Sequence, residues 1–370
     1  MSAVLTHDEI YRLPKIDLHR HLDGAVRPEL LLRLAKELGI KLPTYDLEEL
    51  VKLYQITEPG MSIDQIFQRF AWPIAVMRTP YGLFTAAYEQ VLDMARENII
   101  YSEVQLAPGY HSIYTAPWYS AEMYEQNLFP PMTLDQVAEA VLAGFDQGMK
   151  ETGVVVNTNF CIPRESLDVW GPDSVENYLN LCFRFQTDGV VAMGLACDEY
   201  KYSPDPYIEY FRRLKGSRIR GNPHGGEMGP DQQRLQNIMT CFFGLGAHGI
   251  THALPIHQNK FLMYMASKTN VRIERTPLSP VPGCSLADGH LDVLLKYKVP
   301  VVITSDDPVL MQASLTDNWV AVLNYHQFGE EQFWQMTANA VNTAFYRDQA
   351  QKTLVQDMFV KQGLSPSLLK

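Results

Sequence analysis

The stretch Lys15–Gly24 reads Lys-Ile-Asp-Leu-His-Arg-His-Leu-Asp-Gly, a short apolar run that ends in two histidines separated by one residue. Alternate side chains of a β-strand point to the same face, so we expect His19 and His21 to project together from a strand end. Two adjacent imidazoles suit a divalent metal such as zinc, although an isolated pair also occurs on solvated surfaces. The polar residues farther along the chain decide between these two interpretations.

Further apolar segments follow the first strand, and helical patterns separate them. They lie at residues 99–106, 154–162, 190–196, 219–224, 247–251, 271–276 and 299–305. Helices are expected before Gly39, after the capping residue Thr133, and at residues 206–214 and 286–297. Strands that alternate with helices in this way predict an α/β fold, a closed parallel (β/α)8 TIM barrel.

Two long segments between the strands carry many aromatic residues. The mixed helical region from about residue 39 to 98 contains Phe67, Phe70 and Trp72, and we expect it to cover the barrel mouth as a lid after the first strand. Packing between helices explains the same aromatic residues equally well. The segment 110–131 either lines a pocket or contacts another subunit.

The composition is that of a compact globular protein, with 46% hydrophobic and 20% charged residues. No linker or repeat divides it, so we expect one domain over residues 1–370. A net charge of −11 argues against nucleic-acid binding. Five scattered cysteines, no apparent signal peptide and no bilayer-length apolar run indicate a cytoplasmic protein without membrane partners. The oligomeric state is left open.

Polar residues follow four of the predicted strands, at the barrel end where active sites are built. The first strand ends in His19 and His21, the fifth in the segment from His224 to Glu227, the sixth in His248, and the eighth in Asp306 and Asp307. Each alone is explained by a turn, a cap or a scaffold hydrogen bond. Together they predict metal-assisted hydrolysis, because three imidazoles and a carboxylate can hold zinc beside a water whose pKa falls to about 7.

These residues lie in segments that resemble the motifs of the adenosine deaminase family of the amidohydrolase superfamily. The segments are Leu-His-Arg-His-Leu-Asp-Gly, His-Gly-Gly-Glu, Ala-His-Gly and Thr-Ser-Asp-Asp-Pro, with Leu195–Glu199 similar to the family's fourth-strand motif. Phe67, Phe70 and Trp72-Pro73 resemble its lid region. The resemblance covers nearly the whole chain. It implies an enzyme, a hydrolase that converts adenosine or 2′-deoxyadenosine to inosine or 2′-deoxyinosine and ammonia.

The resemblance also assigns the metal ligands. It makes His19, His21, His224 and Asp306 the ligands of one zinc ion per chain, a set that also accepts iron or cobalt. The fourth strand has no lysine to bridge two metals, which favours a single ion. No PCxxC motif is present, so the nucleic-acid deaminases that use one are set aside.

The same resemblance assigns roles toward an aminopurine substrate. Glu227 would protonate N1 as hydroxide adds to C6, and His248 would orient that hydroxide. Asp307 would hydrogen-bond N7, Asp23 would contact the ribose 5′-hydroxyl, and the backbone at Cys197 would address N3. Phe67 and Trp72 would border the substrate. His252 and His257 are expected to be structural or surface residues.

Several positions depart from the family pattern. Cys197 stands where the family has a glycine, which puts a side chain close to the base. Ala107-Pro108-Gly109 and Ser279-Pro280 also differ, and Leu245–Gly249 lacks an arginine. Hydrolysis is therefore expected, while adenine or a 5′-modified adenosine remains an alternative substrate. Asp23 favours a nucleoside, because an unpaired buried carboxylate is costly. The other alternative is a catalytically silent binding protein, which the intact polar set opposes.

Overall fold

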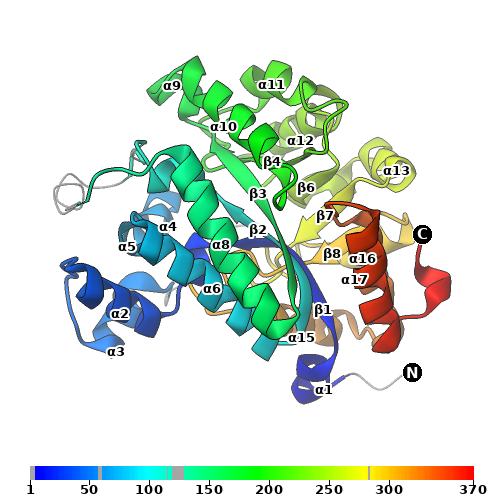
Figure 1. Cartoon of the computed structure of the whole chain (residues 1–370). Coiled ribbons are helices and arrows are strands. Elements are labelled where there is room, and N and C mark those ends of the chain that lie inside the picture. Colours follow the sequence, from blue (N-terminus) through cyan, green and yellow to red (C-terminus); the bar gives the residue numbers. More distant parts are fainter. Residues whose placement is uncertain (1–4, 57–60, 115, 119–128, 282–283) are drawn as a thin grey trace.

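The computed structural model describes residues 5–56, 61–114, 116–118, 129–281 and 284–370 (Figure 1). Parallel strands form an eight-stranded sheet in the order β1 to β8. They are β1 Lys15–His21, β2 Ile99–Leu106, β3 Val155–Pro163, β4 Val190–Ala196, β5 Arg220–Gly225, β6 Gly249–His252, β7 Arg272–Arg275 and β8 Val301–Ile303. The chain after β8 returns to β1, since Asp306 N donates to His19 O (2.9 Å) and His21 N donates to Asp306 O (2.8 Å). The predicted (β/α)8 barrel is confirmed.

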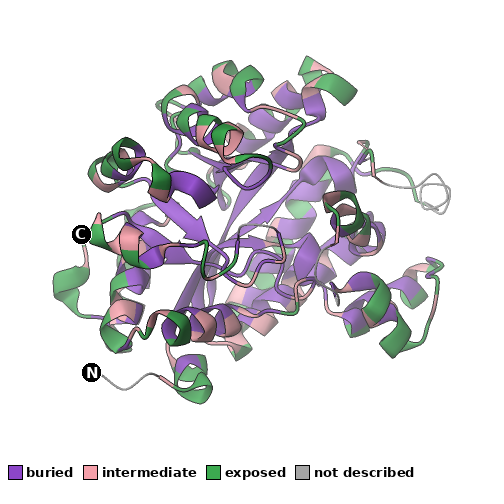
Figure 2. Cartoon of the chain, turned by 180° about the vertical axis from the view of Figure 1, so that it is seen from behind, coloured by how far each residue is buried: buried purple, intermediate pink, exposed green. Residues whose placement is uncertain are grey.

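Helices surround this barrel (Figure 1). They are α1 His7–Arg12, α2 Pro28–Leu38, α3 Leu47–Tyr54, α4 Ile63–Arg69, α5 Ala71–Val76, α6 Pro80–Arg96, α8 Leu134–Thr152, α9 Ser166–Val169, α10 Pro172–Arg184, α11 Ile208–Arg212, α12 Asp231–Met239, α13 Lys260–Thr269, α14 Leu291–Lys296, α15 Leu315–His326, α16 Glu330–Thr343 and α17 Gln349–Lys361. The strands are buried, and the exposed residues lie on the outer helices and loops (Figure 2). None of the helices within the described ranges is long and apolar enough to cross a bilayer.

The local signals that predicted the helices are present in the structure. Thr133 caps α8 by accepting a hydrogen bond from Gln136 N (3.2 Å), and Gly153 ends that helix with φ +77°. Pro28 begins α2, and Gly39 ends it with φ +70°. The helices expected at residues 206–214 and 286–297 are shorter, because only residues 208–212 and 291–296 are α-helical.

β8 is two residues shorter at each end than the expected range 299–305, whereas β6 is displaced along the chain. The expected strand at residues 247–251 is found at Gly249–His252, which moves both of its ends toward the C-terminus. The chain reaches β6 through a π-helical turn, Thr240–Gly244, followed by Gly246 with φ +63°. As a result His252, rather than His248, lies at the carboxyl end of the strand.

The helical region between β1 and β2 borders the mouth of the barrel. Residues of α4 and α5, among them Ile66, Phe67 and Ile74, line the cavity next to the strand ends. Other apolar side chains of the same helices pack into the core, as Ala71 and Val76 do. That this region moves as a lid stays a prediction.

A buried ion cluster joins β2 to β7 inside the barrel. The Arg272 guanidinium donates from Nε to Glu274 Oε1 (2.7 Å), forms an ion pair with Glu103, and lies 3.7 Å from the ring centroid of Phe345. Glu103 also accepts a hydrogen bond from Phe345 N. None of these four residues is among those that line the cavity at the strand ends.

Candidate functional site

Three histidines and one aspartate converge where β1, β5 and β8 end. The Nε2 atoms of His19 and His21 are 3.1 Å apart, and His224 Nε2 lies 3.3 Å from His21 Nε2. Asp306 Oδ1 lies 3.2 Å from His19 Nε2 and 3.5 Å from His21 Nε2. The four residues predicted as metal ligands are therefore brought together from positions far apart in the sequence.

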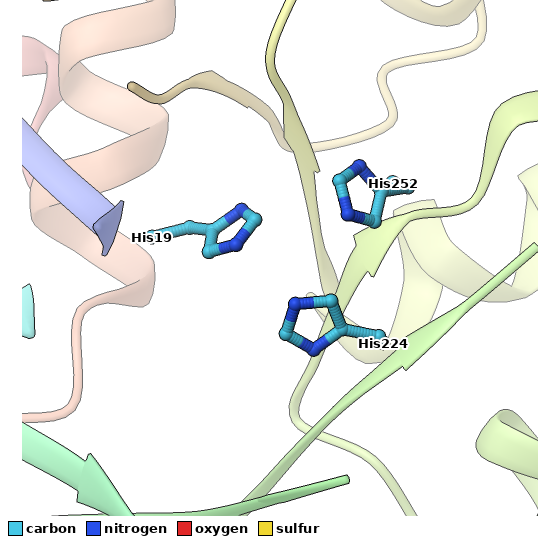
Figure 3. A group of neighbouring side chains, drawn as sticks. All are labelled: His19, His224 and His252. Atoms are coloured by element: carbon cyan, nitrogen blue, oxygen red, sulfur yellow. The ribbon is translucent and has the colours of Figure 1, made fainter. Parts of the chain in front are cut away.

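A fourth histidine, His252, completes the cluster. Its ring centroid is 5.3 Å from those of His19 and His224, and Figure 3 shows the three side chains facing one another. His252 Nε2 lies 3.4 Å from Glu227 Oε1 and 4.0 Å from Asp306 Oδ2, and the residue is 1% exposed. The expectation that His252 is a structural or surface residue is therefore wrong, because its side chain lies within the cluster.

His248 lies outside the cluster, so its predicted position at a strand's carboxyl end is wrong. The residue precedes β6, where its backbone N–H donates to Gly221 O (2.8 Å). Its side chain is exposed and lies near Arg220, with Nε2 3.5 Å from Arg220 Nη1. His248 precedes β6 and His252 is its last residue, so the two histidines lie at opposite ends of the strand and only His252 reaches the site.

The protonation states of this cluster suit a metal. Burial lowers the pKa of His21 to about 4 and that of His224 well below its usual value, so both imidazoles are neutral and offer lone pairs. Burial alone would raise the pKa of Asp306, but the charge and hydrogen bond of His19, with His252 and His21, hold it below its ordinary value. His19 differs from these two histidines: burial lowers its pKa, but the charge and hydrogen bond of Asp306 outweigh burial and raise it, so His19 must lose its proton to bind a metal. Three neutral imidazoles with an ionised carboxylate form a ligand set typical of zinc. These residues fit a metal centre.

Glu227 follows β5 on a tight turn. Gly226 has φ +79°, and a Cβ there would lie 2.5 Å from Ile238 Cδ1, so both the conformation and the space require glycine. Glu227 is 7% exposed, and burial together with the negative charges of Asp306 and Glu199 raises its pKa well above the usual value. A carboxyl group in this state can donate a proton near neutral pH.

A cavity opens beside the cluster. Its lining includes His21, Asp23, Phe67, Tyr110, Trp118, Cys197, His224, Glu227, His252, Asp306 and Asp307. Burial and the charge of Asp306 raise the pKa of Asp307, so its carboxyl can donate a hydrogen bond. Four of the five predicted substrate contacts, all except Trp72, lie on this cavity.

Trp72 is absent from the cavity wall and packs, partly buried, against the hydrophobic core. The tryptophan that lines the cavity is Trp118, from the aromatic segment that was expected either to line a pocket or to contact a subunit. Residues 115 and 119–128 of that segment lie outside the described ranges. The placement of Trp72 beside the substrate is therefore not supported, because its helix turns it toward the core.

Cys197 and Asp23 each have a partner that the sequence did not reveal. Cys197 has φ +77° and places Sγ 3.3 Å from Tyr110 Oη, so the thiol occupies the cavity wall where the family's glycine would leave space. Asp23 Oδ1 lies 2.9 Å from Nε2 of the buried His111, within ion-pair distance but without hydrogen-bond geometry. Both pairs join loops that are remote in sequence, which explains why spacing did not signal them.

Comparison with known proteins identifies the family. The family model described as adenosine deaminase matches residues 14–361. The chain belongs to the adenosine deaminase family. It is a hydrolytic deaminase, and the deaminases of this family are metal-dependent.

Relatives and solved structures match this deaminase along nearly its whole length. It is 26% identical to an adenosine deaminase of Gallus gallus over 97% of this chain and 98% of the relative, and 28% identical to one of Aliivibrio fischeri over 95% and 99%. An adenine deaminase from Arthrobacter aurescens has a TM-score of 0.78 at 21% identity, covering 94% of this chain and 98% of that one. An N6-methyl-AMP deaminase from Arabidopsis thaliana also has a TM-score of 0.78, at 19% identity, covering 97% and 99%. These structures support the fold.

Proposed function

We propose that this deaminase hydrolyses the 6-amino group of adenosine or 2′-deoxyadenosine in a zinc-dependent reaction, releasing ammonia and a 6-oxopurine nucleoside. The observation that carries the proposal is the convergence of His19, His21, His224 and Asp306 on a cavity that also holds Glu227. The relatives from Gallus gallus and Aliivibrio fischeri, named adenosine deaminase, support the choice of substrate.

The charge of the cavity favours a substrate without phosphate. Carboxyl groups of Asp23, Glu227, Asp306 and Asp307 line it, and no lysine or arginine of the described chain does. The segments outside the described ranges contain no lysine or arginine either. Lys201 lines only an adjoining cavity, together with the acidic Asp64, Glu165 and Asp198. A phosphate, with about −1.5 to −2 charges at pH 7, would find no lysine or arginine to pair with on the described part of this lining.

The mechanism follows from the residues around the cavity. His19, His21, His224 and Asp306 would hold the metal, which when bound supplies a Lewis acid that makes water a stronger nucleophile near neutral pH. Glu227 donates its proton to N1 of the purine as water adds to C6.

His252 and Asp307 complete this mechanism. Burial lowers the pKa of His252 to about 3, so its imidazole is neutral and can orient the attacking water by accepting a hydrogen bond from it. The protonated carboxyl of Asp307 can donate a hydrogen bond to N7. One proton of the water is transferred to the amino group, which leaves C6 as ammonia. The other proton leaves the C6 hydroxyl for Glu227, so that C6 keeps a carbonyl oxygen and Glu227 is protonated again.

A free base is the second candidate substrate. Asp23 Oδ1 lies 2.9 Å from His111 Nε2, within ion-pair distance but without hydrogen-bond geometry. An imidazole at this distance can pair with Asp23 when ribose is missing, provided that the imidazole is protonated, and this weakens the main argument against adenine. The similar structure from Arthrobacter aurescens is named an adenine deaminase, and it supports keeping this alternative.

Ammonia release by the zinc-loaded protein tests the proposal. The panel holds adenosine, 2′-deoxyadenosine, 5′-deoxyadenosine, adenine and AMP, and zinc content is measured on the same sample. We expect adenosine and 2′-deoxyadenosine to have the highest kcat/KM, with AMP at least about 100-fold lower. A preference for adenine would mean that the substrate is the free base and not the nucleoside. A preference for AMP would contradict the inference that the cavity, whose described lining holds no lysine or arginine, disfavours a phosphate.

The Glu227→Gln variant, assayed with the same panel, tests whether Glu227 transfers the proton. It is expected to retain zinc and to lose turnover, because the amide cannot deliver the proton. Turnover that survives in this variant would remove Glu227 from the proton-transfer role.

We also propose that the chain is one domain and acts in the cytoplasm. All five cysteines fall within the described ranges, and all are free. Unpaired thiols are typical of a reducing compartment. Fractionation of the source cells, with a cytoplasmic marker enzyme followed in parallel, tests the location.

A further inference from the structure

A buried carboxylate outside the cavity holds the loop that carries Glu227. Glu199 follows β4 and is 1% exposed. Its Oε2 accepts from Gly226 N (2.9 Å), and its Oε1 accepts from Met228 N (2.6 Å) and from Glu227 N. Three consecutive backbone N–H groups therefore point at one side chain. Such charge-assisted hydrogen bonds are among the stronger ones in proteins.

Two further side chains complete this arrangement. Asn237 Nδ2 donates to Glu199 Oε2 (3.1 Å). Arg164, which is buried after β3, places Nη2 3.8 Å from Glu199 Oε2 and donates from the same nitrogen to His224 O (2.6 Å). The arginine thus holds the first residue of the segment His224–Met228, and the glutamate holds its last three.

The segment needs such support because its own sequence does not fix it. It contains Gly225 and Gly226, and Gly226 has φ +79°. Glycine gives the unfolded chain more freedom than any other residue, so an unsupported Gly-Gly turn is mobile. Yet His224 and Glu227 must both point into the cavity, and a misplacement of about 1 Å can cost about 100-fold in rate.

We propose that Glu199, supported by Arg164, is a positioning residue of the reaction, fixing the backbone of His224–Met228 so that the imidazole and the carboxyl of this segment face one cavity. This inference rests on the proposed function. Glu199 is not among the residues that line the cavity in the described chain, so it acts through the loop and does not touch the substrate.

The Glu199→Gln variant tests the proposal. The amide has nearly the shape of the carboxylate. However, its NH₂ group would replace a carboxylate oxygen that accepts from a backbone N–H in wild type, so a donor would face a donor and that hydrogen bond would be lost. We expect kcat to fall by roughly 10- to 100-fold while KM changes by less than about threefold. Zinc content should stay at one ion per chain. Hydrogen–deuterium exchange at the amides of residues 226–228 should become faster.

Glu103→Gln is the matched control. Glu103 is also 1% exposed, pairs with an arginine and accepts a backbone N–H, from Phe345, but it belongs to the ion cluster between β2 and β7. We expect this variant to lower Tm while it leaves kcat and the exchange of residues 226–228 unchanged.

Each other outcome counts against the proposal. A kcat of Glu199→Gln within about twofold of wild type, or unchanged exchange at residues 226–228, would overturn it. An equal loss of kcat in Glu103→Gln would mean that general destabilisation is the cause. If Glu199→Gln does not fold, Glu199→Asp replaces it, with a smaller loss of kcat expected in the same direction.

The two proposals can fail separately. If wild type deaminates no aminopurine, the proposed function fails, and the exchange at residues 226–228 alone decides whether Glu199 holds the loop. If wild type is active but the kcat of the Glu199 variants is unchanged, the deaminase proposal stands and the positioning role falls.

Discussion

His252 and His248 stand at opposite ends of β6, so their replacement separates a site residue from a scaffold residue. His252→Ala removes an imidazole that lies 3.4 Å from Glu227 Oε1 and 4.0 Å from Asp306 Oδ2. We expect kcat to fall by about 10²- to 10³-fold, the usual cost of removing one group positioned against the reacting atoms. Initial rates of ammonia release, with zinc content measured on the same protein, check this.

His248→Ala serves as the control for that experiment. Its side chain is exposed and lies beside Arg220, away from the cavity, so kcat should stay within about twofold of wild type. A large loss in His248→Ala together with an unaffected His252→Ala would reverse the assignment.

The residues at the site show what sequence can predict. His19, His21 and His224 lie at the carboxyl ends of β1 and β5, and Glu227 and Asp306 closely follow β5 and β8. A barrel gathers all such positions on one rim. Choosing between His248 and His252 required knowing where β6 begins and ends, because His248 precedes the strand and His252 is its last residue. The short strand has too few residues for its pattern to fix its ends.

At the scale of elements, the turn after β5 is the critical one. Gly226→Ala forces a Cβ to within 2.5 Å of Ile238 Cδ1 at a residue with φ +79°. We expect the free energy of unfolding to fall by about 1–3 kcal/mol, and kcat to fall as well because Glu227 is displaced. Urea denaturation and steady-state rates measure the two effects.

Gly216→Ala provides a control with the same backbone strain. Gly216 has φ +86°, but a Cβ there meets nothing within 4 Å. It lies between α11 and β5, away from the cavity. The variant should lose stability through strain alone and keep the wild-type kcat. Equal losses of kcat in both variants would show that strain anywhere near β5 impairs the enzyme.

Elements with long apolar patterns were predicted well, and contacts between loops were not. β2 and β4 match the expected ranges 99–106 and 190–196, because each is a continuous buried run. The partners of Glu199 and of Cys197 lie on loops that only the closed barrel brings together. No spacing in the sequence encodes such contacts, so only the folded chain reveals them.

At the scale of the whole molecule, we expect the ion cluster inside the barrel to contribute to stability and not to chemistry. Arg272→Met would leave Glu103 and Glu274 buried without their shared arginine. We expect the free energy of unfolding to fall by about 3–5 kcal/mol while kcat of the folded enzyme is unchanged. Urea denaturation followed by circular dichroism checks the loss.

Arg184→Met is the surface control for that variant. Arg184 Nη2 lies 2.7 Å from Asp135 Oδ1, with side chains 51% and 48% exposed, so its loss should cost about 0–1 kcal/mol. Similar losses of unfolding free energy in Arg184→Met and Arg272→Met would show that burial of the ion pair does not determine its contribution to stability.

Metal binding connects the whole barrel, because the ligand residues His19, His224 and Asp306 come from β1, from β5 and from the chain after β8. A ligand that binds only the folded state stabilises it by about 4 kcal/mol when its free concentration is 1,000 times Kd. We therefore expect a chelator to lower Tm and abolish ammonia release, and added zinc to restore both. Asp306→Asn should bind zinc weakly, so its Tm should respond little to the chelator. A wild-type Tm that does not change on chelation, with zinc shown to be removed, would mean that these strand ends are held together without the metal.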